Sequence, residues 1–189
     1  KKFGPMPLIL DDGFAHRSIA RTLNILVVDG HDPWGKGMLP HGTRREPLWG
    51  IKRADAIVVT RNPGFQNSEA VCSDIKNRGF RKPVFTAART AECVVAPDGS
   101  RKTIGECRQM QFYVFSGIAH GDRFAEMVRA LGLPVKGSIS YSDHFQFDGL
   151  EMDQLRTNAS GALLLSTEKD FWRLDHSVRR DVYYLKIRL

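Results

Sequence analysis

The sequence is poor in cysteine, with Cys72, Cys93 and Cys107 as the only three among 189 residues. An odd number of widely spaced cysteines fits neither a disulfide framework nor a zinc motif, so we expect a reducing, cytosolic environment. The sequence also lacks any apolar run close to the roughly 20 residues that a membrane-spanning helix needs. It opens with no signal-peptide pattern. Any membrane contact of this chain is therefore expected to be peripheral.

Low-complexity stretches, Cys/His finger spacings and an aromatic RNA-binding signature are absent as well. A hydrophobic content of 42% and a charged content of 26% are ordinary for a soluble globular protein. The formal net charge of +7 favours an anionic partner, such as a nucleotide, a phosphorylated lipid or an acidic membrane surface. Because the basic residues are dispersed along the chain, no nucleic-acid partner is expected.

Short apolar runs alternate with polar or amphipathic segments in the first half of the chain. This pattern predicts strands over 8–10, 24–29, 54–60 and 84–87 and helices over 48–53 and 67–79. The segment 31–46 is rich in glycine, proline and basic residues and is expected to be a long functional loop. The alternation predicts an α/β fold with a parallel sheet and helices on its faces.

Residues 88–107 break this alternation. A short apolar run and the turn sequence Pro97-Asp-Gly-Ser predict a β-hairpin, which we expect to link two lobes. Alternation then resumes, which predicts a second α/β lobe. Its expected strands lie over 111–116, 135–140, 162–166 and 182–187, and its expected helices over 122–131 and 150–157.

The apolar run before residue 11 ends in two adjacent carboxylates, Asp11 and Asp12, followed by a glycine. Ligands of open α/β sheets bind at the carboxyl ends of the strands, so these side chains are expected at the mouth of a site. Magnesium prefers hard oxygen ligands and commonly takes one or two carboxylates together with substrate phosphates. A magnesium site and a polar strand end that opens a turn both explain this triplet.

The loop Leu39-Pro-His-Gly-Thr-Arg-Arg-Glu-Pro brings arginines and a glutamate to a proline-stiffened turn. Such a loop suits phosphate binding or the orientation of a polar substrate, and a salt-bridged surface turn is the alternative. We expect Arg45 and Glu46 at the same sheet edge as Asp11 and Asp12.

Other motifs admit two interpretations each. His144, in a strand-to-helix loop, suits a general base or a surface turn, and His16 is similarly ambiguous. Thr167-Glu-Lys-Asp is explained by a helix N-terminus that Ser166 or Thr167 caps. The glycine of Phe115-Ser-Gly-Ile-Ala is explained by a tight bend or by a close approach to a ligand. The aromatic residues suit core packing or contact with a lipid chain; these are Trp34, Trp49, Phe171 and Trp172.

Taken together and in order, these motifs resemble those of the tetraacyldisaccharide 4'-kinase family. The resemblance rests on Asp11-Asp-Gly-Phe-Ala-His-Arg, Asn24-Ile-Leu-Val-Val-Asp, Leu39-Pro-His-Gly-Thr-Arg-Arg-Glu-Pro, Arg53-Ala-Asp-Ala, Phe115-Ser-Gly-Ile-Ala, Asp143-His144 and Thr167-Glu-Lys-Asp. It spans nearly the whole chain. It implies transfer of phosphate from ATP, with magnesium, to the 4'-hydroxyl of a tetraacylated glucosamine disaccharide 1-phosphate in lipid A assembly.

The resemblance also implies roles for individual residues. Asp11 and Asp12 match an acidic pair that serves magnesium and the nucleotide, and His16 lies in the same motif. Arg45 and Glu46 match an active-site loop. His144 matches a catalytic histidine between the lobes, which in the family pairs with an upstream aspartate.

The family's Walker A loop, a glycine-rich turn with Lys and Ser/Thr, does not occur in this sequence, and Ala15 stands where the family usually has Gln. We therefore expect the chain to be the C-terminal part of the kinase and inactive alone. The expected domains are a P-loop-kinase-like remainder over 1–87, the hairpin linker over 88–107 and a second lobe over 108–189.

The resemblance implies that the parent enzyme is a monomer that contacts the cytoplasmic face of the bacterial inner membrane peripherally. The alternative is a non-catalytic remnant that binds an anionic glycolipid or a nucleotide. A soluble nucleotide-binding module unrelated to lipid would require the order of the motifs to be coincidental.

Overall fold

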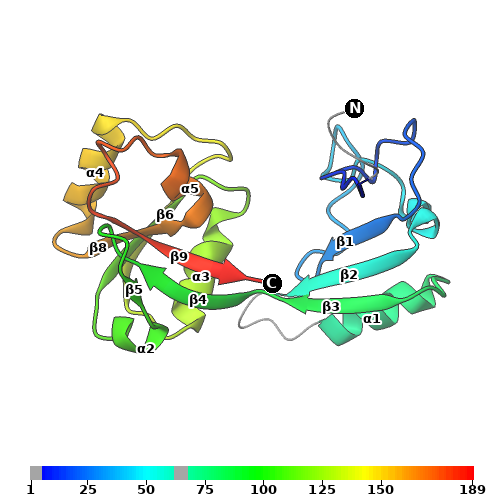
Figure 1. Ribbon diagram of the computed structural model, residues 1–189, viewed down its shortest axis with the longest axis horizontal. Coiled ribbons are helices and arrows are strands. Elements are labelled where there is room, and N and C mark those ends of the chain that lie inside the picture. The colour runs from blue at the N-terminus through cyan, green and yellow to red at the C-terminus, as the bar shows by residue number, and fades with distance from the viewer. Residues whose placement is uncertain (1–5, 62–67) are drawn as a thin grey trace. The chain divides into compact units, whose positions relative to one another are not determined.

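The computed structural model describes residues 6–61 and 68–189. Within this part, the chain divides into two compact units, unit 1 over 6–61 and 68–87 and unit 2 over 88–189. Helices and strands alternate in both, so the predicted α/β class is confirmed (Figure 1). No helix in the described ranges is long and apolar enough to cross a bilayer.

Unit 1 is built on a three-stranded sheet with the order β1-β2-β3. Its strands are β1 (Ile25–Asp29), β2 (Ala56–Arg61) and β3 (Val84–Ala88), and its helices are the 3-10 helix η1 (Leu48–Arg53) and α1 (Ser68–Asn77). β1 and β2 are parallel, with Ile25 opposite Ala56 and Asp29 opposite Thr60. The core of unit 1 lies on one face of this sheet, where Ile57 and Val59 pack with Val71 and Ile75 of α1.

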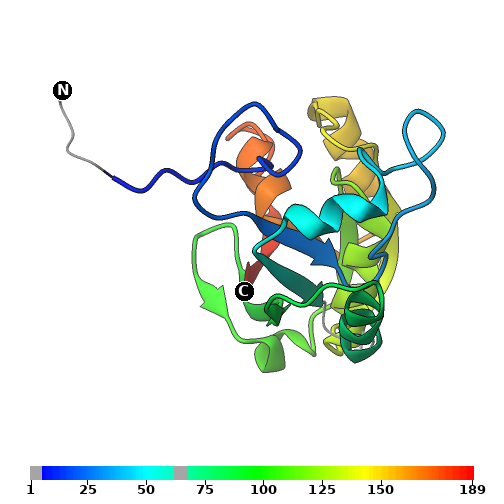
Figure 2. The same ribbon diagram turned by 90° about the vertical axis from the view of Figure 1, so that its right-hand side faces the viewer.

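The predicted strand over 8–10 is wrong. These residues have no regular secondary structure, and Leu8 and Ile9 are 86% and 91% exposed. Figure 2 shows this stretch as an extended trace outside the sheet. A strand needs a neighbour that satisfies its backbone groups, and within the described residues no strand lies beside 8–10.

Unit 2 is built on a six-stranded mixed sheet with the order β5-β4-β9-β8-β6-β7. Its strands are β4 (Thr90–Val95), β5 (Arg101–Lys102), β6 (Phe112–Ser116), β7 (Val135–Ser140), β8 (Leu163–Thr167) and β9 (Val182–Arg188). Its helices are α2 (Ile104–Cys107), α3 (Gly121–Ala130), α4 (Gly149–Ala159) and α5 (Glu168–Arg173). β7, β6, β8 and β9 run parallel, and β4 pairs antiparallel with β9 and β5.

Both faces of this sheet are covered by helices. One core cluster joins α4 and α5 to the sheet through Met152, Leu155 and Phe171. The other joins α2 and α3 to it through Cys107, Phe124 and Val128. Buried parallel strands with helices on both faces are the arrangement that the alternating sequence pattern favours.

The hairpin predicted within 88–107 exists as β4 and β5, but its expected role as a linker is wrong. β4 pairs with β9 over most of its length, and Val94, which is fully buried, belongs to the core of unit 2. The apolar residues that made this hairpin identifiable also make it part of the sheet, because they need a core to pack against.

Candidate functional site

In unit 1, the acidic turn and the basic loop meet through one ion pair. Nη1 of Arg45 lies 2.5 Å from Oδ2 of Asp12, although the two residues are 33 positions apart in the sequence. Asp12 has φ of +50°, in the left-handed region, and its side chain is 72% exposed. The ion pair is therefore an exposed contact that a ligand can reach, and such contacts contribute little to stability.

Arg45 and its neighbour Glu46 have different partners. Glu46 receives two hydrogen bonds from Arg53, at 2.6 and 2.9 Å, and these bonds hold the pKa of the Glu46 carboxyl below its usual value. The Arg53 guanidinium also donates to the carbonyl of Phe14 and lies over the Phe14 ring. Glu46 and Arg53 thus fix the turn that follows Asp12, while Arg45 reaches the carboxylate itself.

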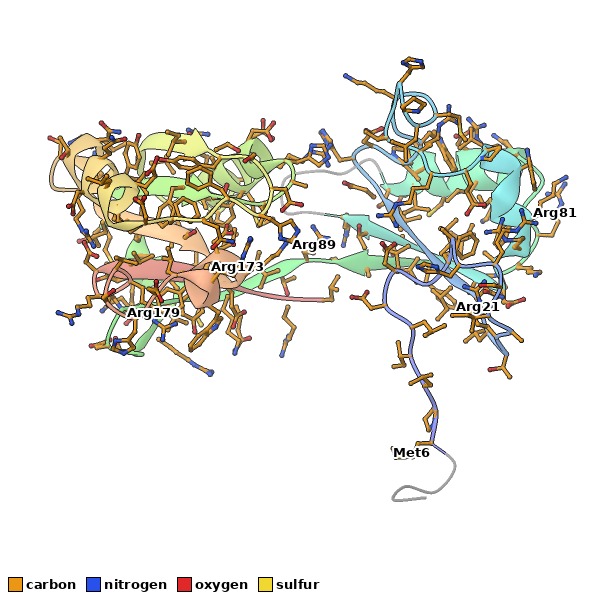
Figure 3. All side chains as sticks on the ribbon, turned by 90° about the horizontal axis from the view of Figure 1, so that it is seen from above. Met6, Arg21, Arg81, Arg89, Arg173 and Arg179 are labelled. Atoms are coloured by element: carbon orange, nitrogen blue, oxygen red, sulfur yellow. The ribbon has the colours of Figure 1, made fainter. Side chains whose placement is uncertain are left out.

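Backbone contacts hold the rest of the acidic turn. The buried Gly13 carbonyl accepts hydrogen bonds from the amide of His16 and from the side chain of Arg21, which Figure 3 labels. The side chains of Asp11 and His16 are exposed and make no hydrogen bond to another described residue. Of the residues predicted for this site, the structure joins Asp12 to Arg45 directly and leaves Asp11 and His16 open to solvent.

The donor set can be tested against a magnesium ion. Among the described residues, no group of three or more His, Cys, Asp or Glu side chains is arranged to hold a metal. Magnesium does not require such a group, because it retains waters and binds substrate phosphates beside one or two carboxylates. The exposed carboxylates of Asp11 and Asp12 are hard oxygen donors of the right kind, so these residues fit a magnesium ion delivered with a nucleotide.

In unit 2, His144 lies in the loop between β7 and α4. Its backbone has φ of +64°, and its amide donates to the carbonyl of Gly117 at 3.1 Å. Nε2 of His144 lies 3.5 Å from Oδ2 of Asp143, whose Oδ1 lies 3.7 Å from Nζ of Lys169. Partial desolvation raises the pKa of the Asp143 carboxyl, but the charges of His144 and Lys169 outweigh this effect and leave that pKa below its usual value. The imidazole is exposed, and a carboxylate lies beside it.

Asp170 is a supporting residue that the sequence analysis missed. Its side chain is 1% exposed, and Oδ2 accepts hydrogen bonds from the Gly117 amide at 3.0 Å and from the Thr167 hydroxyl at 2.8 Å. Thr167, one of the two residues predicted to cap this helix, caps α5 by accepting a hydrogen bond from the Asp170 amide. The carbonyl of Gly117 also accepts the hydrogen bond from the His144 amide. Asp170 therefore holds in place the residue to which the His144 backbone is hydrogen-bonded. An aspartate at the third position of a helix that follows a buried strand was the available signal.

Comparisons with known proteins address the whole chain. The family model described as tetraacyldisaccharide-1-P 4'-kinase matches residues 1–189. The chain is 32% identical to the tetraacyldisaccharide 4'-kinase of Chlorobium limicola, over 99% of this chain and 56% of the relative. It is 32% identical to the enzyme of that name from Aquifex aeolicus, over 92% of this chain and 50% of the relative.

A solved structure is similar as well. The crystal structure of LpxK from Aquifex aeolicus in complex with ATP matches with a TM-score of 0.59 and 28% identity, over 93% of this chain and 50% of that one. The chain spans about half the length of the curated relatives it matches.

Proposed function

Because this chain belongs to the tetraacyldisaccharide 4'-kinase family, we propose that the whole protein transfers the γ-phosphate of ATP to the 4'-hydroxyl of a tetraacylated glucosamine disaccharide 1-phosphate. The observation that carries the proposal is the family match over residues 1–189. The contact between Asp12 and Arg45 supports it, because phosphoryl transfer depends on placing acidic metal ligands and cations around the phosphates.

Asp11 and Asp12 are the residues that would hold magnesium. When bound, magnesium neutralises charge on the transferring phosphates. Arg45 orients the Asp12 carboxylate, and its remaining N–H groups are available to phosphate oxygens, for which the guanidinium fork is well shaped. Glu46 is proposed to act indirectly: its hydrogen bond with Arg53 positions the guanidinium that holds the turn after Asp12.

His144 is proposed to receive or orient the proton of the attacking sugar hydroxyl. The support for this role is geometric: the imidazole is exposed in the loop before α4, and its Nε2 lies 3.5 Å from Oδ2 of Asp143. Asp170 acts as a positioning residue, through Gly117.

The acceptor determines the proposed setting of the reaction. A tetraacylated disaccharide is anchored in a lipid layer by its acyl chains, so we propose that the whole protein works at the cytoplasmic face of the inner membrane through a peripheral contact. The net charge of +7 supports contact with an anionic surface. We also propose that the whole protein is a monomer and that it has no nucleic-acid partner.

The test is transfer of labelled γ-phosphate from ATP to the disaccharide 1-phosphate in detergent micelles, with this chain and with the variant Asp12→Ala. Parallel samples measure retention of the labelled acceptor by the chain. The matched control is Asp122→Ala, which removes an exposed carboxylate from α3 in unit 2.

Transfer that is abolished by Asp12→Ala and kept by Asp122→Ala would support the kinase proposal for this chain and for Asp12. Acceptor binding without transfer is the result expected of a C-terminal portion of the kinase that recognises the acceptor but does not position ATP. Transfer that Asp12→Ala leaves unchanged would refute the role of Asp12.

A further inference from the structure

A cavity of about 380 Å³ lies in unit 2 beside α5. It is bounded by α5, by the segment that leads into β9, and by the turn between β4 and β5. Its volume falls within the range of about 300–1,000 Å³ of small-molecule sites. It shares no residue with the phosphoryl-transfer site proposed above, so the inference does not depend on that function.

Aromatic rings form one wall of the cavity. The Phe171 ring centroid lies 4.6 Å from that of Tyr184 and 5.3 Å from that of Trp172. Phe171 and Tyr184 are buried, whereas Trp172 is 59% exposed. The exposed part of Trp172 therefore remains available to a ligand, and contact with it favours a planar or apolar group.

Two arginines line the same cavity. The Arg179 guanidinium lies 5.0 Å from the Trp172 ring centroid and 5.2 Å from that of Phe171, and Figure 3 labels this residue. Arg180 follows it directly and is exposed. Within the described residues, neither guanidinium forms an ion pair with a carboxylate.

Asp98 on the rim carries the opposite charge. Its Oδ1 accepts the Ser100 amide at 2.9 Å, and hydrogen bonds from Ser100 keep its pKa below the usual value. This carboxylate belongs to the turn between β4 and β5. Its single negative charge is smaller than the two positive charges of Arg179 and Arg180 in the same cavity. A guanidinium held over aromatic rings has fewer conformers to lose when it binds an anion.

We propose that this cavity binds a small organic phosphate whose planar or apolar body packs against Trp172 and Tyr184 and whose phosphate is held by Arg179 and Arg180. The guanidinium fork matches phosphate oxygens in two-point hydrogen bonding. The aromatic wall distinguishes a phosphate ester from free phosphate, because only the ester buries apolar surface.

The experiment is titration of the 189-residue chain with phenyl phosphate, followed by quenching of tryptophan fluorescence. The variant Trp172→Phe identifies the part of the signal that comes from Trp172. Inorganic phosphate is the second probe, and we expect it to bind at least about tenfold more weakly. The double variant Arg179→Gln/Arg180→Gln is expected to weaken phenyl phosphate binding at least about tenfold.

The matched control is Arg108→Gln/Arg129→Gln, which removes the same charge from residues that do not line the cavity. If the double variant fails to fold, the single variant Arg180→Gln replaces it, because it keeps the contact of Arg179 with the rings. Arg180→Gln is also expected to weaken phenyl phosphate binding. Circular dichroism checks the fold of each variant.

Three results would overturn the proposal: no saturable binding of phenyl phosphate, binding that the cavity variant and the control weaken equally, or equal affinity for phenyl phosphate and inorganic phosphate. Phosphatidylglycerol vesicles are the third probe, and binding to them alone is a fourth result that would overturn the proposal, in favour of a membrane surface. Saturable binding that depends on Arg179 and Arg180 would support it.

Discussion

Replacement of Asp170 tests whether the loop that carries His144 depends on a buried carboxylate. In Asp170→Ala, the buried Gly117 amide loses its acceptor, which costs about 1–3 kcal/mol. Loss of the ion pair with Arg173, whose atoms lie 3.5 Å apart, adds less than about 1 kcal/mol because Arg173 is partly exposed. The expected loss of unfolding free energy is about 3 kcal/mol, roughly a hundredfold change in the folding equilibrium.

The variant Asp170→Asn separates the effect of the side chain's shape on stability from the effect of its charge. One oxygen, Oδ2, accepts both the Gly117 amide and the Thr167 hydroxyl, so an asparagine with its carbonyl oxygen at that position keeps both bonds. It loses the charge that strengthens them and the ion pair, so we expect a cost of about 1 kcal/mol. Glu126→Ala, which removes an exposed carboxylate from α3, is the control and should change stability by less than about 0.5 kcal/mol.

Urea denaturation measures the stability, and hydrogen exchange with mass spectrometry locates the change. Asp170→Ala should speed amide exchange in peptides that contain Gly117 and His144, because the two amides belong to one chain of hydrogen bonds. A loss below about 1 kcal/mol, or faster exchange spread evenly over unit 2, would refute the reasoning.

Two further predictions concern ion pairing and thiol burial. Glu46→Gln should lower the stability of unit 1 by about 1 kcal/mol at pH 7. Because the pKa of Glu46 is lowered from 4.5, chiefly by its hydrogen bonds with Arg53, this contribution is present above pH 4.5 and disappears as the pH falls through the folded-state pKa. Urea denaturation at a series of pH values from 7 downward should therefore show the difference in stability between parent and variant shrinking once the pH is below 4.5, and a difference that does not change with pH would contradict the assignment. A thiol reagent should label Cys72 first in the native chain, since Cys93 and Cys107 are buried and burial raises the pKa of the Cys107 thiol. Rapid native labelling of Cys107, read by mass spectrometry, would contradict the described packing.

Local patterns were sufficient to predict most elements of the fold. The strands of both units lie close to the predicted ranges, because alternation of apolar runs with amphipathic segments reports which residues must be buried. Ser166 and Thr167 were the two candidates predicted to cap the helix that follows, and Thr167 is the cap; this prediction was possible because capping involves residues only three apart. The prediction of a strand over 8–10 was wrong because it rested on a local apolar run alone, and such a run becomes a strand only beside a pairing partner.

The sequence by itself determined the α/β alternation, the family and the identities of the candidate site residues. The tertiary structure decided which of those residues meet: Asp12 with Arg45, Glu46 with Arg53, and Asp170 with Gly117. These last two residues lie 53 positions apart. Contacts of this kind arise when β6 and β8 pair and bring their carboxyl ends together, and the order of strands in a sheet depends on the packing of the whole unit rather than on any local pattern.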